Sequence, residues 1–117
     1  MASLRGVPYA SHYAASKHGL LGLMRSLAAE YAKTNLTVNA VCPGYVDTPM
    51  TDQSVQNIIA RTGMTPEKAR TALENTSPQR RLIEPEEVAA MTVYLALDIS
   101  KGITGQAINI DGGGLMS

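Results

Sequence analysis

The stretch YAASKHGLLGLMRSLAAEYA, residues 13–32, carries the most information about the fold of this 117-residue chain. Apolar side chains recur through it at helical spacing, namely Leu20, Met24, Leu27 and Tyr31. This period predicts a long helix over residues 13 to about 33. Further apolar side chains lie off that stripe, at Leu21, Leu23 and Ala28. Because a helix that is apolar on more than one side normally packs on two partners, we expect both sides to be covered, which a short chain can hardly do alone.

Tyr13 and Lys17 stand four residues apart at the head of this predicted helix, so both side chains project from one face. They are therefore within reach of the same ligand. A phenol is a poor acid or base at neutral pH, and a nearby ammonium favours its ionised form. Taken alone, a Tyr and a Lys at this spacing are more often solvent-exposed side chains without a chemical role than a reactive site.

A buried parallel strand is predicted over residues 36–42, which are rich in β-branched residues and almost continuously apolar. Pro43 and Gly44 end it, and by themselves they indicate a plain strand-ending turn. Val55, Ile58 and Ile59 then predict a short helix.

Gly63 is placed to terminate that helix at its C′ position. Thr65, Pro66 and Glu67 begin the next one, with Thr as N-cap, Pro at the first helical position and an acid in the first turn. These two helices are expected to form a small helical lobe.

A turn over residues 78–81 leads into a firmer helix that starts at residues 84–87 and should end near Asp98. One face of it is apolar, at Val88, Met91, Thr92 and Leu95. A last strand is predicted over residues 106–110. The order of helices and strands is an α/β pattern, although two strands make a poor parallel sheet by themselves.

Composition limits the classes of function. Lys plus Arg equals Asp plus Glu, at ten each, so no net positive charge is available to bind a nucleic acid or an anionic membrane. Cys42 is the only cysteine, which excludes an internal disulfide and favours a cytoplasmic protein. No window approaches the roughly 20 apolar residues of a membrane span, and residues 1–12 are expected to form a loop without an export signal.

Four blocks of the sequence together resemble the short-chain dehydrogenase/reductase family: YAASKHGLLGLMRSLAAEYA, NAVCPGYVDTPM, RLIEPEEVAAMTVYLA and ITGQAINIDGG. They follow one another in order and cover nearly the whole chain. The resemblance implies the C-terminal part of a Rossmann-like doubly wound parallel sheet. It would contain the catalytic helix, the two last strands and a small helical lobe on the substrate side.

In that family a tyrosine exchanges a proton with the substrate oxygen, and a lysine binds the nicotinamide ribose and lowers the tyrosine pKa. The resemblance places these roles on Tyr13 and Lys17. It makes Pro43 and Gly44 the turn beside the cofactor and gives contacts with the nicotinamide carboxamide to Val46 and Thr48.

The implied cofactor is NAD or NADP, and the reaction is hydride transfer between it and a secondary alcohol or ketone. Residues 43–87 most resemble members that act on 3-hydroxyacyl or 3-oxoacyl substrates, such as 3-hydroxybutyrate dehydrogenases and 3-oxoacyl-carrier-protein reductases. A homodimer or homotetramer is implied for the complete enzyme.

The family's glycine-rich phosphate turn, its Asn-Asn-Ala-Gly segment and its catalytic serine do not occur in this sequence, since Ser3 and Ser11 lie too near the tyrosine. We therefore expect residues 1–117 to be a single partial domain, the catalytic and substrate-side half of a longer enzyme. The alternative is a non-catalytic interaction module or an inactive fragment, which the sequence encoded upstream of Met1 would distinguish.

Other candidate residues have plainer interpretations. Cys42 is interpreted as a buried strand residue, and His12 and His18 as helix-surface residues without metal-ligand spacing. Arg80 and Arg81 could contact a phosphorylated carrier such as coenzyme A, or be simply solvated. The three glycines at 112–114 open no helix and are not expected to hold phosphate.

Overall fold

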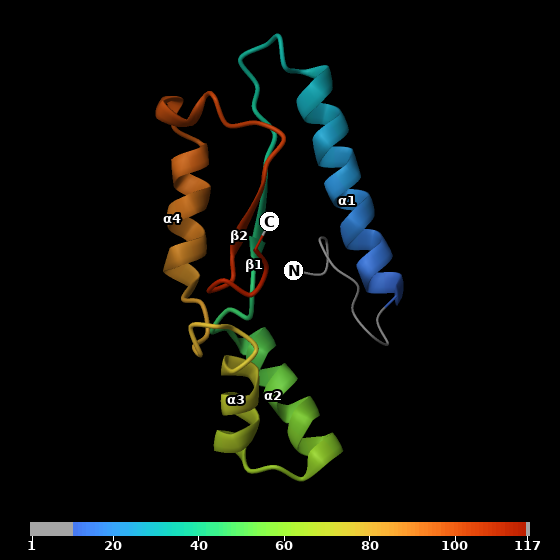
Figure 1. The fold of residues 1–117 in the computed structure, drawn as a ribbon, viewed down its shortest axis with the longest axis vertical. Helices are drawn as coiled ribbons and strands as arrows, with labels where there is room; N and C mark the ends of the chain where they lie inside the picture. The colour runs from blue at the N-terminus through green and yellow to red at the C-terminus, as the bar shows by residue number, and fades with distance from the viewer. Residues whose placement is uncertain (1–10, 117) are drawn as a thin grey trace. The chain divides into compact units, whose positions relative to one another are not determined.

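The structure is a computed structural model that describes residues 11–116 (Figure 1). The described chain divides into two compact units, one of residues 11–42 with 90–109 and the other of residues 43–89 with 110–116. No helix within residues 11–116 is long and apolar enough to cross a membrane.

The first unit is built on a two-stranded sheet of β1 (Ala40–Pro43) and β2 (Ala107–Ile110). The amide of Ala40 donates to the carbonyl of Gln106, and the amide of Gly44 to that of Ile110, both at 2.9 Å. The same sequence offset at both ends is that of a parallel pair. Helix α1 (Ser11–Glu30) and the last part of α4 (Pro85–Leu95) lie on either side of the strands (Figure 1). The predicted α/β class is confirmed.

Helix α1 buries only part of the apolar surface that the sequence indicated. Its buried side chains are Leu21, Met24 and Ala28. An added Cβ at Gly105, two residues before β2, would lie 3.5 Å from the Cβ of Ala28, so this stripe is the one that faces the sheet region. Leu20 and Tyr31 are exposed, as expected for a helix whose two apolar sides this chain cannot both cover. Because both sides of the helix are apolar, the period alone does not select a face. The helix also ends at Glu30 rather than near residue 33.

Strand β1 begins four residues later than predicted, because side chains take the place of ladder bonds at its entrance. Asn39 donates from Nδ2 to the carbonyl of Ile103 at 2.7 Å and accepts from the amide of Gln106 at 3.1 Å. The amide of Val38 donates to Oγ1 of Thr104 at 3.1 Å. The expected full burial was also wrong, since only Cys42 is buried in the two strands, and no further strand pairs with them within residues 11–116.

The second unit contains the predicted helical lobe, formed by α2 (Pro49–Thr62) packed against α3 (Pro66–Glu74). Its buried core consists of Val55, Ala69, Leu73 and Leu82, with Ile58 and Ile59 packed against it. Gly63 ends α2 with a φ of 69°, as predicted for a C′ glycine. Thr65 caps α3 by accepting from the amide of Lys68 at 3.4 Å.

Three helices begin at a proline, α2 at Pro49, α3 at Pro66 and α4 at Pro85. Proline suits the first helical position because its fixed φ is already helical and its missing N–H would have no partner there. Helix α4 ends at Leu95, and the chain continues into a short 3-10 helix, η1 (Asp98–Ser100).

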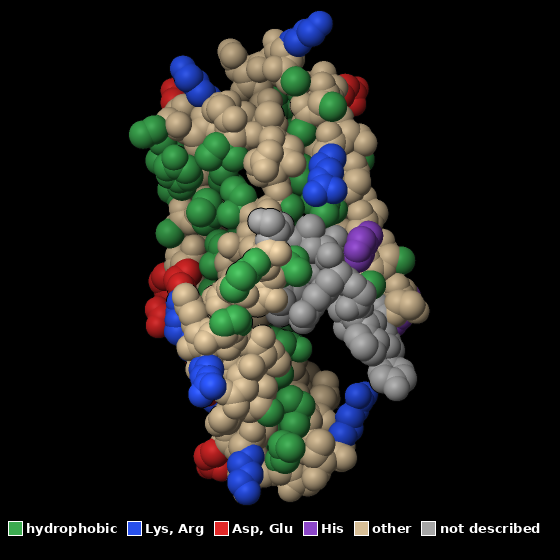
Figure 2. Space-filling model, in the orientation of Figure 1, with side chains coloured by type: hydrophobic (Ala, Val, Ile, Leu, Met, Phe, Trp, Pro, Cys, Tyr) green, Lys and Arg blue, Asp and Glu red, His purple; other side chains and the backbone are tan. Residues whose placement is uncertain are grey.

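The predicted inner face of α4 is half-buried except at Thr92, which is exposed. Hydrophobic side chains also gather on the outer surface over α4 (Figure 2). The exposed ones in and just after this helix are Val93, Tyr94, Leu97 and Ile99.

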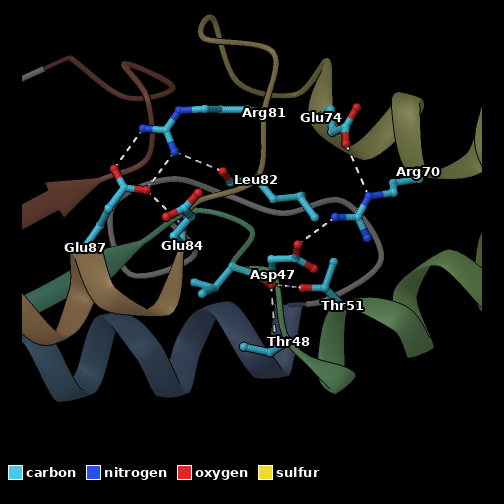
Figure 3. Close-up of polar contacts among 10 residues, drawn as sticks. Asp47, Thr48, Thr51, Arg70, Glu74, Arg81, Leu82, Glu84 and Glu87 are labelled. Atoms are coloured by element: carbon cyan, nitrogen blue, oxygen red, sulfur yellow. Dashed lines mark hydrogen bonds and ion pairs between the residues drawn. The ribbon is translucent and has the colours of Figure 1, made fainter.

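Glu87 closes the first turn of α4. Its carboxylate accepts from both terminal nitrogens of Arg81, at 2.6 and 2.8 Å, and from the amide of Glu84 at 2.8 Å (Figure 3). The contact between the Glu87 carboxylate and the amide of Glu84 is one half of a capping box. It satisfies an amide that the helix leaves unpaired. Arg81 is thus held by Glu87, and the hydrogen bonds from Arg81 and Glu84 lower the pKa of Glu87 from 4.5 to about 2.

This carboxylate should make stability depend on pH in acid. A group with a lowered pKa in the folded state contributes stability above its unfolded pKa, and loses it as pH falls to the folded pKa. The window for Glu87 therefore runs from about pH 4.5 down to about pH 2. Glu87→Gln should flatten the fall of stability across this window in urea titrations. Glu86→Gln, which removes a carboxylate outside the Arg81 pair, should keep the wild-type slope, and an unchanged slope in Glu87→Gln would contradict the assignment.

Candidate functional site

The candidate catalytic pair lies on the first turns of α1. The Nζ atom of Lys17 is 5.4 Å from the centroid of the Tyr13 ring, within the range of a cation–π contact. Tyr13 is half exposed and Lys17 is partly buried. The structure therefore brings the two predicted residues together with the phenol open to a ligand.

The neighbouring histidines lie on the surface of α1. His12 and His18 are exposed on α1, and His18 Nδ1 lies 2.8 Å from the carbonyl of Ala14, within hydrogen-bonding distance. No group of three or more His, Cys, Asp or Glu side chains that could hold a metal ion occurs within residues 11–116. Cys42 is buried in β1, in agreement with its interpretation as a strand residue.

The second group of predicted residues lies on one loop of the second unit. At its start, Gly44 donates its amide to the carbonyl of Ile110 at 2.9 Å. A Cβ added at Gly44 would lie 3.1 Å from the Cα of Asp111 and 3.2 Å from its Cβ. Only glycine lets the backbone at position 44 come this close to Asp111 without displacing it. Gly44 therefore has a structural role beyond that of a plain turn.

Asp111 is a buried residue that the sequence interpretation missed. Its Oδ1 accepts from the amides of Gly113 and Gly114 at 3.1 and 3.0 Å, whereas its buried Oδ2 has no hydrogen-bond partner within residues 11–116. Gly112 adopts a φ of 65°, and a Cβ there would come within 2.2 Å of Ser77 Oγ. The glycine run therefore wraps the Asp111 carboxyl, which occupies two of its amides. An Asp followed by glycines after a strand is the signal that would have found it.

The loop beyond Gly44 pairs with a segment much later in the chain. Ile83 donates its amide to Tyr45 and accepts from that of Asp47, both at 2.9 Å, which makes a parallel bridge at Val46. The buried hydroxyl of Thr51 donates to the carbonyl of Val46 (Figure 3). The backbone that presents Val46 is thus fixed from two sides.

Thr48 occupies the N-cap position of α2 without capping it by its side chain. Its carbonyl accepts from the amides of Thr51 and Asp52 at 2.9 and 3.2 Å. Its hydroxyl makes only a long contact of 3.4 Å to the carbonyl of Val46. The side-chain oxygen of an N-cap threonine normally accepts a hydrogen bond from a backbone amide in the first turn of the helix. Here that oxygen remains available to a ligand.

Arg70 of α3 reaches the same loop. It donates from its terminal nitrogen to Oδ2 of Asp47 at 2.7 Å, and from Nε to Oε1 of Glu74 at 3.3 Å (Figure 3). The hydrogen bond with Asp47 is the main cause that raises the pKa of Arg70 above its usual value. Neither Asp47 nor Arg70 stood out in the sequence, because the pair joins residues 23 positions apart.

Comparison with known proteins places these features in a family. Residues 1–114 match the model of a family described as Enoyl-(Acyl carrier protein) reductase. The 3-oxoacyl-[acyl-carrier-protein] reductase FabG of Thermotoga maritima is 44% identical over 108 residues, which are 92% of this chain and 39% of that protein.

Solved structures agree with this match. A short chain dehydrogenase family protein from Francisella tularensis subsp. tularensis SCHU S4 superposes with a TM-score of 0.91 at 34% identity, over 97% of this chain and 47% of that one. The chain belongs to the short-chain dehydrogenase/reductase family. A variant of the actinorhodin polyketide ketoreductase, solved with NADPH, is likewise similar, with a TM-score of 0.89, 38% identity and coverage of 96% of this chain and 43% of that one.

The match to short-chain dehydrogenases confirms the resemblance and the partial Rossmann-like fold expected from the sequence. The chain spans about 40% of the length of the curated relatives that it matches. Within this family, the roles of Tyr13, Lys17, Val46 and Thr48 remain predictions.

Proposed function

We propose that this chain supplies the catalytic pair and the substrate side of an NAD(P)-dependent oxidoreductase that interconverts a secondary alcohol and a ketone. The observation that carries the proposal is the contact of Lys17 with the exposed Tyr13 at the head of α1. A half-exposed phenol beside an ammonium is suited to exchange a proton with a bound substrate.

The cofactor, when bound, supplies or takes up the hydride at the substrate carbon. In the reductive direction, Tyr13 gives its hydroxyl proton to the carbonyl oxygen, which becomes the alcohol. In the oxidative direction, Tyr13 takes the proton back from the alcohol. Lys17 places its positive charge against the phenol ring and is proposed to contact the nicotinamide ribose.

The loop of residues 43–48 is proposed to lie beside the nicotinamide ring. Gly44 lets Asp111 pack against the start of this loop, and Thr48 keeps its hydroxyl free of its own helix. We assign the contacts with the carboxamide to Val46 and Thr48, and the turn beside the ring to Pro43 and Gly44. Either NAD or NADP is compatible with these residues, which do not include a contact with the adenosine ribose.

The proposed substrates are 3-oxoacyl or 3-hydroxyacyl compounds. The support is the 44% sequence identity with a 3-oxoacyl-[acyl-carrier-protein] reductase and the structural likeness to a polyketide ketoreductase. Both names describe enzymes that reduce a ketone on an acyl chain. Homo-oligomers are also proposed, because α1 leaves Leu20 and Leu23 more than half exposed.

The test measures nicotinamide absorbance with a 3-oxoacyl thioester and either NADH or NADPH. It uses the chain alone and a fused protein, in which the chain follows the N-terminal part of the Thermotoga maritima reductase that it does not match. We expect the fused protein to reduce the thioester. No turnover with any ketone would contradict the function, whereas turnover of simple ketones alone would contradict only the substrate class.

A further inference from the structure

The peptide of residues 45–48, which carries both proposed carboxamide contacts, is tied to α3 of the helical lobe by one ion pair. Asp47 lies between Val46 and Thr48 in the chain, and Arg70 lies on α3. Their Oδ2 and terminal nitrogen atoms are 2.7 Å apart, which is a short charge-assisted hydrogen bond.

The other restraints on this peptide come from α2 and from residue 83. Ile83 pairs with its backbone, and Thr51 binds the carbonyl of Val46. Neither residue belongs to α3. The Arg70 pair is therefore the polar contact through which α3 acts on this peptide.

Glu74 keeps the guanidinium in place from the other side. Its Oε1 accepts from Nε of Arg70, one helical turn away on α3, at 3.3 Å. An arginine presents several donors in a rigid fork, so one guanidinium can serve both carboxylates at once. Glu74 thus orients the guanidinium of Arg70, and Asp47 accepts its hydrogen bond.

We propose that Arg70 is a positioning residue, whose bond to Asp47 holds residues 45–48 in the form that binds the nicotinamide carboxamide. This inference rests on the proposed function. The bond joins α3 to residues 45–48, which are proposed to contact the cofactor. A shift of α3 should therefore change how tightly the cofactor binds. Without the bond, the peptide has to be ordered when the cofactor binds, which weakens binding but leaves the reacting groups intact.

The first test is independent of activity and uses the chain itself. Arg70→Ala should speed amide hydrogen exchange of residues 45–48 by about two- to five-fold, the scale of an exposed ion pair. Glu74→Gln is the matched control, since it removes the negative charge of the other partner of Arg70 and leaves Asp47 paired. It should change this exchange less. Equal exchange in Arg70→Ala and the wild type would overturn the proposal.

The second test measures kinetics in the fused protein. Arg70→Ala should raise the KM for the cofactor by about two- to five-fold with kcat almost unchanged. Arg70→Lys should recover part of the loss, because an ammonium can still pair with Asp47. The difference between Arg70→Ala and the wild type should become smaller near 1 M salt, where the screening length falls to about 3 Å.

The outcomes separate the two proposals. An inactive wild-type fused protein would count against the proposed function, while the exchange measurement would still test the role of Arg70. An active wild type whose cofactor KM is unaffected by Arg70→Ala would overturn the inference and leave the function standing.

Discussion

Tyr13→Phe in the fused protein is expected to lower kcat by about 10²- to 10⁴-fold, the usual contribution of a positioned general acid. The substitution removes only the hydroxyl, so the ring that Lys17 contacts stays in place. Cofactor affinity should therefore change little. Stopped-flow absorbance for turnover and fluorescence titration of NADPH for binding provide the two measurements.

Lys17→Ala is the informative comparison, because the proposed ribose contact makes it a binding residue as well. It should weaken cofactor affinity and turnover together, whereas Tyr13→Phe should separate them. If Tyr13→Phe kept most of the wild-type kcat, the proton would come from another group. The assignment of the catalytic pair to α1 would then be wrong.

Leu73→Ala is expected to destabilise the lobe of α2 and α3 by about 2–5 kcal/mol, the range for emptying a buried leucine site. Leu73 is 5% exposed and belongs to the cluster that contains Val55, Ala69 and Leu82. The lobe has no second core to compensate within the described residues of its unit. Urea unfolding followed by circular dichroism gives the change in free energy.

Leu73→Met is the volume-conserving control and should lose less than about 1.5 kcal/mol. The comparison separates the cavity from any general sensitivity of α3. A loss below about 1 kcal/mol in Leu73→Ala would mean that the cluster collapses around the smaller side chain or that α3 is not packed as described.

Local signals in the sequence predicted the parts of the fold that short-range chemistry determines. Gly63 and Thr65 set the end of α2 and the start of α3, because a left-handed C-cap and an N-cap hydroxyl depend on nearby backbone alone. The spacing of Tyr13 and Lys17 likewise predicted that they share one face of a helix, and the structure confirms their contact.

Features that depend on distant parts of the chain were not predictable in this way. The start of β1 is decided by Asn39, whose side chain bonds to a loop 64 residues later. The buried side of α1 could not be read from a helix with two apolar sides. Arg70 acts through Asp47, a partner that only the fold brings near, so nothing beside it in the sequence marked it.

The prolines at the starts of α2, α3 and α4 also have an effect on the unfolded chain. Pro49, Pro66 and Pro85 restrict the backbone before any contact forms, so less conformational entropy is lost when these helices form. The same residues slow the search for the native state. The described peptide bonds are all trans, yet each prolyl bond in an unfolded chain is cis in about 10–30% of molecules and isomerises over tens of seconds or longer. Part of the population must therefore wait for isomerisation before the second unit can fold.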